Sequence, residues 1–131
     1  LMYADADGRL HHKPQRQVFS VVDGIVGGEG NGPLDPTPRS AGVIVAGVNP
    51  VAVDLACACL MGFDYQRLPI LHRAIGEHPL RLTDFDPDEI RCMSNDPRSY
   101  DLLKECDSLV PAFTPHFGWK GHVEIRGNGV E

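Results

Sequence analysis

Two runs of hydrophobic residues in the first half of the chain predict two buried β-strands. The first run, VFSVVDGIV, occupies residues 18–26, and the second, GVIVAGV, occupies residues 42–48. Both are apolar at neighbouring positions instead of alternating with polar residues, which is typical of central strands covered on both faces of a sheet. Such strands need helices to cover them, so we expect helices elsewhere in the chain.

The pattern after the second run predicts the main helix. Within NPVAVDLACACLMG, Asn49 suits the N-cap, Pro50 the first helical position and Gly62 the left-handed residue after the last turn. A shorter helix is expected over residues 69–77, where apolar residues recur with helical spacing and Gly76 can end it. Alternating strands and helices predict an α/β layered fold, with a mostly parallel or mixed sheet covered by helices.

The second half of the chain has shorter and less regular signals. An acidic loop should lead to a short strand near residues 89–93, then a helix over PRSYDLLKEC, and an aromatic tail should hold a last strand at residues 122–126. We interpret the chain as one α/β domain or the C-terminal portion of a longer protein. Its parts are a connective segment (residues 1–17), a motif-bearing core (18–77) and the irregular remainder (78–131).

The segment between the two predicted strands is rich in glycine and proline. DGIVGGEGNGP, at residues 23–33, is a candidate binding loop, because glycines let the backbone approach a ligand closely. The alternative is a flexible surface turn. NGPLDPTPRS, at residues 31–40, contains three prolines and is expected to be an extended, stiff loop at the surface or at the rim of a site.

Length and charge narrow the class of protein. The 131 residues suit one domain, and a formal charge of -6 with scattered Lys and Arg argues against binding to nucleic acid or to an anionic membrane. No apolar run approaches the roughly 18 residues of a membrane-spanning helix. Because the chain opens on Leu1 with no basic and apolar leader, we expect a fragment of a cytoplasmic protein.

The chain contains cysteine, histidine and serine, but these residues do not have the spacing of known metal-binding, iron–sulfur or nucleophile motifs. Cys57, Cys59, Cys92 and Cys106 lack the close C-x-x-C pattern, so we expect reduced thiols and no iron–sulfur cluster within this chain. The histidines never take the i, i+4 spacing of H-E-x-x-H, and no serine or cysteine lies in a nucleophile motif. Covalent catalysis therefore has no support in the sequence.

Three acids and an amide are the candidate site residues. Asp54 is the acid within an apolar helix, so it is either buried with a partner or exposed near the helix start, where the helix dipole favours its charge. Glu29 lies among glycines, Asp23 ends the first strand, and Asn49 ends the second. If the two strands are parallel neighbours, these four side chains converge at one edge of the sheet.

Such a cluster suits two kinds of ligand. Asp23, Glu29 and Asp54 offer hard oxygen ligands for a divalent metal such as Mg, Mn or Ca, or partners for a polar small molecule. Alternatively, amides at the start of the helix at Asn49 could hold a phosphate or nucleotide, with Arg39 nearby. In either case the loop residues Gly30, Asn31 and Gly32 are candidate ligand contacts.

The motifs resemble a known family. VVDGIVGGEGNGP and RSAGVIVAGVNPVAVDLACACLMGFD are similar to the C-terminal half of domain-of-unknown-function family 362, over about residues 18–75. That family has no settled activity, and its members often look like iron–sulfur-associated proteins, with cluster cysteines in a ferredoxin-like segment elsewhere in the full chain. The resemblance implies site or loop-shaping roles for Asp23, Glu29, Gly30, Gly32, Pro33 and Asp54.

Two main hypotheses for function follow. The first is a carboxylate-lined metal or small-molecule site, in which Asn49 orients the ligand and any chemistry is metal-assisted or redox-linked. The second is a non-catalytic module that docks the ferredoxin-like segment or a second subunit through the glycine loop and the aromatic tail. Phosphate or nucleotide binding at the helix start is a further alternative.

Overall fold

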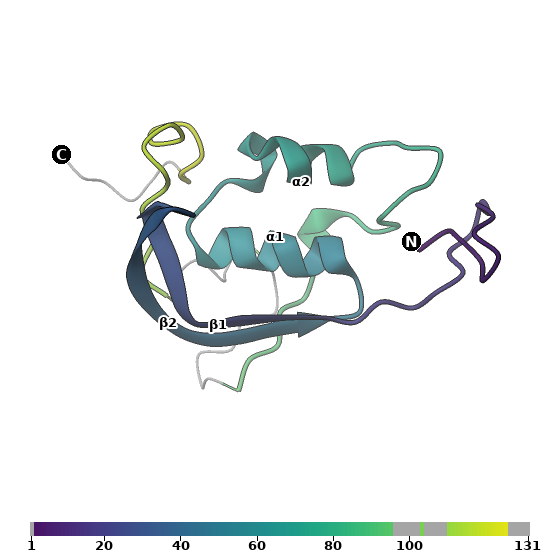
Figure 1. The fold of residues 1–131 in the computed structure, drawn as a ribbon, viewed down its shortest axis with the longest axis horizontal. Helices are drawn as coiled ribbons and strands as arrows, with labels where there is room; N and C mark the ends of the chain where they lie inside the picture. Colours follow the sequence, from purple (N-terminus) through teal and green to yellow (C-terminus); the bar gives the residue numbers. More distant parts are fainter. Residues whose placement is uncertain (1, 96–102, 104–109, 126–131) are drawn as a thin grey trace.

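The protein folds into a β-hairpin with two helices stacked above it (Figure 1). The structure is a computed structural model that describes residues 2–95, 103 and 110–125. Helix α1 lies between the hairpin and helix α2 (Figure 1). In chain order the elements are β1 (Ser20–Asn31), β2 (Asp35–Gly47), α1 (Pro50–Leu60), the 3-10 turn η1 (Tyr65–Arg67), α2 (Pro69–Ala74) and the 3-10 turn η2 (Pro87–Glu89).

The two strands are antiparallel, which corrects the prediction of a mostly parallel sheet. Ser20 pairs with Gly47 at the open end of the hairpin, and Asn31 pairs with Asp35 beside the turn. Only three residues connect the strands, including a cis Gly32–Pro33 peptide bond. A parallel pair needs a crossover of about a dozen residues or more, so this short connection permits only a hairpin. The mixed α/β class is confirmed.

The glycine-rich and proline-rich segments are strand, not loop. Gly27 and Gly28 of β1 pair with Arg39 and Pro38 of β2, and the strands continue to the turn. Proline is tolerated because each strand of a two-stranded sheet has an edge at which no N–H is needed. Glycine fits next to these prolines, because a Cβ on Gly28 would lie 2.8 Å from Cβ of Pro36, the diagonal neighbour across the hairpin. The loop expected over residues 31–40 is therefore wrong for residues 35–40, which belong to β2 (Asp35–Gly47).

Only one face of the hairpin is covered within the described part of the chain. Val43 and Val45 of β2 pack against the core, and a Cβ on Gly47 would lie 2.9 Å from Cγ2 of Val53 in α1. The opposite face, including Val21 and Ile44, is exposed. Both helices lie on the same side of the hairpin (Figure 1). The prediction of strands covered on both faces thus holds for one face alone.

Helix α1 confirms its predicted start and end. The Oδ1 of Asn49 accepts hydrogen bonds from the backbone N–H groups of Val51 (2.9 Å) and Ala52 (3.1 Å). Gly62 follows the helix with φ +77, the left-handed conformation that glycine adopts without strain. Leu55, at 0% exposure, anchors the helix in the core.

The remaining predicted elements are shorter than expected or absent. Helix α2 ends at Ala74 instead of residue 77. The strand predicted near residues 89–93 does not form, and η2 occupies its beginning. Of the strand predicted at residues 122–126, the described residues 122–125 form a single bridge, between Phe63 and Glu124. The predicted helix PRSYDLLKEC lies outside the described residues apart from Leu103, which is buried.

The N-terminal segment does more than connect. Tyr3 is buried, and its hydroxyl donates a hydrogen bond to the backbone carbonyl of Arg81. An isolated bridge between Ala4 and Leu10 closes a turn ahead of β1. Residues 2–17 are therefore tied to the loop that follows α2.

Candidate functional site

The three candidate acids occupy different parts of the molecule. Asp23 lies on the exposed face of β1, Glu29 lies near the hairpin turn, and Asp54 lies on the exposed side of α1. Among residues 2–95, 103 and 110–125, no three His, Cys, Asp or Glu side chains form a group that could hold a metal ion. The structure does not bring these acids together, and their role as ligands stays a prediction.

Asp54 is exposed near the start of α1, which is the second of the two positions expected for it. Its neighbours Val53 and Leu55 are buried, whereas Asp54 itself is exposed. Solvent around the carboxylate removes the need for a buried partner, which was the reason to suspect a site here. Its charge has a local effect, because burial and, second, the charge of Asp54 raise the pKa of the Cys57 thiol. A raised thiol pKa makes Cys57 a poor nucleophile at neutral pH.

The carboxylate of Glu29 is occupied by the protein itself. Its Oε2 accepts a hydrogen bond from the backbone N–H of Thr114 at 2.8 Å, and its Oε1 lies 3.7 Å from Nη1 of Arg39. The backbone N–H of Gly30 donates to the carbonyl of Thr114 at 2.9 Å. The candidate binding loop thus contacts a later part of the same chain.

Arg39 and Gly27 complete this contact. The Nη2 of Arg39 donates to the carbonyl of Ala112 at 2.9 Å, so its charge is used at the hairpin and not at the helix start. Its Nε is buried and has no hydrogen-bond partner within the described residues. A Cβ on Gly27 would lie 2.7 Å from Cε1 of Phe113. We name residues 112–114 the tail strap, since they cross the hairpin between Gly27 and Gly30.

The start of α1 offers few donors to an anion. Pro50 has no N–H, and those of Val51 and Ala52 are bonded to the Asn49 side chain. The N–H of Val53 donates to the carbonyl of Asn49 at 3.1 Å. The Nδ2 of Asn49 donates to the carbonyl of Leu82 at 3.0 Å. The amide of Asn49 therefore shapes the helix start, and its role in orienting a ligand stays a prediction.

The remaining candidate loop residues lie at the hairpin turn. Gly30 has φ +74, and Asn31 and Gly32 lead into the cis Gly32–Pro33 bond. Leu34, 96% exposed, forms the tip of the turn. Of these residues, Gly30 contacts the tail strap through its backbone N–H. Their predicted ligand contacts stay predictions.

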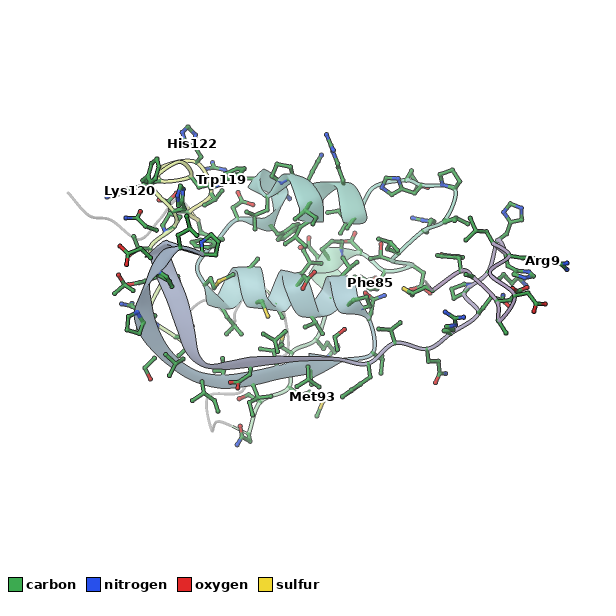
Figure 2. The ribbon with its side chains drawn as sticks, viewed as in Figure 1. Arg9, Phe85, Met93, Trp119, Lys120 and His122 are labelled. Atoms are coloured by element: carbon green, nitrogen blue, oxygen red, sulfur yellow. The ribbon has the colours of Figure 1, made fainter. Side chains whose placement is uncertain are left out.

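Two turns are held by acids outside these candidates. The Oε1 of Glu124 accepts from Gly121 N–H at 2.9 Å, and backbone hydrogen bonds, this one first, lower the pKa of that carboxyl. At the other end, Asp5 lies 2.7 Å from Nε2 of His11, and that hydrogen bond is the main cause of the lowered pKa of Asp5. Figure 2 shows Trp119, Lys120 and His122 around the first of these turns and Arg9 near the second. Both acids are accounted for by local structure.

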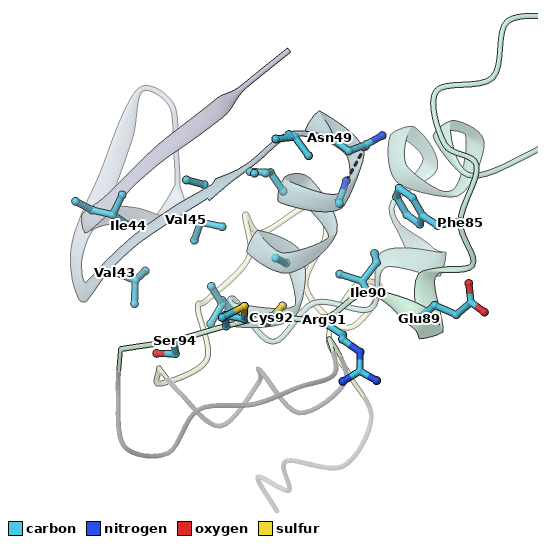
Figure 3. A pocket seen from close by; sticks show the side chains of 18 residues that line it. Val43, Ile44, Val45, Asn49, Phe85, Glu89, Ile90, Arg91, Cys92 and Ser94 are labelled. Carbon is cyan, nitrogen blue, oxygen red and sulfur yellow. Dashed lines mark hydrogen bonds between the residues drawn. The ribbon is translucent and has the colours of Figure 1, made fainter. Parts of the chain in front are cut away.

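A cavity of about 460 Å³ lies between β2, α1 and the segment around residues 85–94 (Figure 3). Val43, Val45 and Ile90 make it largely apolar. The charged side chains of Glu89 and Arg91 point away from the valines in Figure 3. An apolar gap without convergent polar groups lacks what normally fixes the orientation of a ligand. The described residues that line the cavity show no catalytic arrangement.

The surface that the sequence analysis missed is the open side of the hairpin. We name it the outer face: it consists of Val21, Asp23, Ile25, Val26, Ile44 and Ala46, all exposed. Its four large hydrophobic residues are 52–65% exposed. Phe19 and Val48 extend it beyond the ends of the strands. Apolar residues at neighbouring strand positions were the available signal, because they require a cover on both faces.

Fold and surface together define a small mixed α/β module with one open apolar sheet face. The model of a family described as "Domain of unknown function (DUF362)" matches residues 4–59, which include β1, β2 and most of α1. The match lies in the N-terminal part of this chain and covers less than half of it. The resemblance proposed from the motifs is supported there, whereas its assignment to the C-terminal half of the family domain stays a prediction.

The other comparisons add no relative. Neither the curated proteins nor the solved structures yielded a match. Within the described residues, none of the helices has the length and apolar character needed to cross a membrane.

Proposed function

We propose that this chain is a non-catalytic interaction module that binds a second polypeptide segment through the outer face of its β-hairpin. The observation that carries the proposal is the exposure of Val21 and Ile44, at 60% and 65%, within a largely apolar sheet face. Exposed apolar patches of this kind mark interaction sites, because water disfavours them unless a partner covers them. The function is therefore association, with the hairpin as the contact.

The hairpin is suited to this role by its rigidity. On its inner face α1 packs against β2, and at its far end Glu29 and Arg39 hold the tail strap. A surface fixed from behind loses little conformational entropy when a partner binds. The contact we propose differs from the one expected from the sequence, because the glycine segment and the tail strap bind each other.

A catalytic role has less support. Glu29 and Asn49 are bonded within the protein, Asp54 is exposed on another element, and the cavity beside β2 has apolar walls. The divalent metal predicted from the carboxylates remains a hypothesis, as do the redox link and the ferredoxin-like segment that the family resemblance implies. The docking proposal is compatible with a ferredoxin-like segment as the bound partner.

A peptide selection tests the proposal. A displayed library of peptides is selected against the purified chain, and the recovered binders are measured against Ile44→Asp and Ile70→Asp. Ile70 is 78% exposed on α2, so Ile70→Asp is a matched control away from the outer face. We expect Ile44→Asp to weaken binding roughly 10- to 100-fold through loss of one buried isoleucine, and Ile70→Asp to leave it unchanged.

Two outcomes would count against the docking function. One is a library that yields no binder to the folded parent chain. The other is a set of binders whose affinities fall equally, or not at all, with the two substitutions.

A further inference from the structure

We infer that the partner of the outer face is a single amphipathic helix, and that a basic residue within its apolar stripe lies against Asp23. This inference rests on the docking function and specifies its ligand. It follows from the width, the length and the charge of the outer face.

The width of the hairpin suits one helix. Strands lie about 4.8 Å apart, so a two-stranded ribbon with its side chains is about as wide as a helix, roughly 10 Å across. The inner face illustrates this match, because helix α1 packs directly on β2 there (Figure 1). A second helix on the outer face would complete a helix–sheet–helix sandwich.

The length of the face also corresponds to α1. From Val21 to Val26 the apolar positions span about 17 Å at roughly 3.3 Å per residue. A helix covers that distance with about 11 residues at 1.5 Å each. Helix α1 has 11 residues. The expected partner is therefore a helix of about three turns with an apolar stripe.

Asp23 determines the chemistry of that stripe. It is the one charged member of the outer face, and it lies between Val21 and Ile25 on β1 and opposite Ile44 on β2. Its Oδ1 accepts a hydrogen bond from the N–H of Ile25 at 3.0 Å, which orients the carboxylate on the strand. A helix laid over this face would desolvate the carboxylate, and such a charge is tolerated when a cation pairs with it.

The same carboxylate argues against the other occupants. Two copies joined by their outer faces would bring two Asp23 carboxylates into one apolar interface, where like charges repel. An acyl membrane surface would bury Asp23 without a partner, and the chain carries a formal charge of -6. A small molecule is normally enclosed by a concave site, which a sheet face is not.

Two synthetic peptides test the inference. Each is a helix of about 18 residues, long enough to be helical in isolation, with a leucine and alanine stripe and an uncharged polar face. They differ only at the centre of the stripe, which holds Lys in one and Glu in the other. Affinities are measured by calorimetry against the parent chain, Asp23→Lys and Asp84→Lys. Asp84 is exposed in the loop after α2, so Asp84→Lys matches the change in net charge.

We expect the parent chain to bind the Lys peptide at least about tenfold more tightly than the Glu peptide. The preference should reverse in Asp23→Lys and persist in Asp84→Lys. Equal binding of both peptides, or a preference that survives in Asp23→Lys, would overturn the inference while leaving the docking function intact. Self-association of the parent chain that Ile44→Asp abolishes would also overturn the inference. Binding of the parent chain to phosphatidylcholine vesicles that Ile44→Asp abolishes would do the same.

The two proposals fail in different ways. If neither peptide binds but the library yields binders sensitive to Ile44→Asp, docking stands and the helix with its basic residue is wrong. If the library also yields none, both are wrong.

Discussion

The two faces of the β-hairpin have similar side chains and opposite surroundings. On the inner face Val43 and Val45 pack against a core that includes Leu55 of α1. On the outer face Val21 and Ile44 are exposed by more than half. Burial of an aliphatic side chain is worth about 1.5–3 kcal/mol. The inner face therefore stabilises the fold, whereas side chains of the outer face would contribute this free energy when a partner buries them. Hydrophobic sequence alone therefore does not distinguish a core from a docking surface.

The largest effect is expected from placing an acid on the inner face. Val45 is half-buried against the core, so Val45→Asp would partly desolvate a carboxylate there and should lower the free energy of unfolding by about 3 kcal/mol. Its chain neighbour Ile44 points outward, so Ile44→Asp should change that energy by no more than about 0.5 kcal/mol. Urea unfolding followed by circular dichroism measures both. Equal losses for the pair would refute the difference between the faces.

The tail strap extends the covered side toward the hairpin turn. Gly27→Ala would place a Cβ 2.7 Å from Cε1 of Phe113, so we expect a loss of about 1–3 kcal/mol from overpacking. In a Phe113→Ala background the same change should be close to neutral, because the clashing ring is gone. Unfolding of the single and double variants gives the coupling energy. Additive losses would show that Gly27 does not contact the strap.

Glu29, which the sequence predicted to be a metal ligand, contacts the tail strap on the covered side of the hairpin. Its side chain is only 13% exposed, and it accepts the hydrogen bond from Thr114. Glu29→Gln keeps an acceptor but removes the charge, so we expect a loss of about 0.5–1.5 kcal/mol and faster amide exchange at Thr114. Metal content, measured by elemental analysis, should not change. Loss of a bound metal with unchanged stability would restore the metal-site hypothesis.

The smallest effect concerns the exposed side of α1. The charge of Asp54 helps to raise the pKa of Cys57, so Asp54→Asn should lower that pKa and increase the thiolate fraction at neutral pH. We expect alkylation of Cys57 by iodoacetamide to accelerate about two- to threefold at pH 7. The difference should vanish at a pH above the thiol pKa in both proteins. Mass spectrometry of the Cys57 peptide provides the rates, and equal rates at pH 7 would contradict the interaction.

The features that the sequence predicted well depend on residues close together in the chain. Asn49 caps α1 through N–H groups two and three residues away, and Gly62 ends that region with positive φ. The boundaries of the strands were harder, because glycine and proline normally end strands. In this hairpin Gly28 and Pro36 fit beside each other, and this cross-strand fit outweighs their individual preferences.

The candidate site was predicted less well than the fold. Convergence of Asp23 with Asn49 required parallel strands, and the three-residue turn makes the strands antiparallel. The position of Asp54 on the exposed side of α1 was left open by the helix sequence, because its apolar neighbours allow either orientation. The metal and ligand roles assigned to these residues remain predictions that the experiments above can address.

By itself the sequence determined the local structure: the cap and end of α1, the mixed α/β class and the apolar character of both strand faces. Those outcomes depend on backbone geometry and side-chain contacts within a few residues. Only the tertiary structure decided that Glu29 binds Thr114, 85 residues away, and that one strand face is covered while the other is open. These features depend on which segments far apart in the sequence pack together, and the local pattern of residues along the chain does not specify that packing.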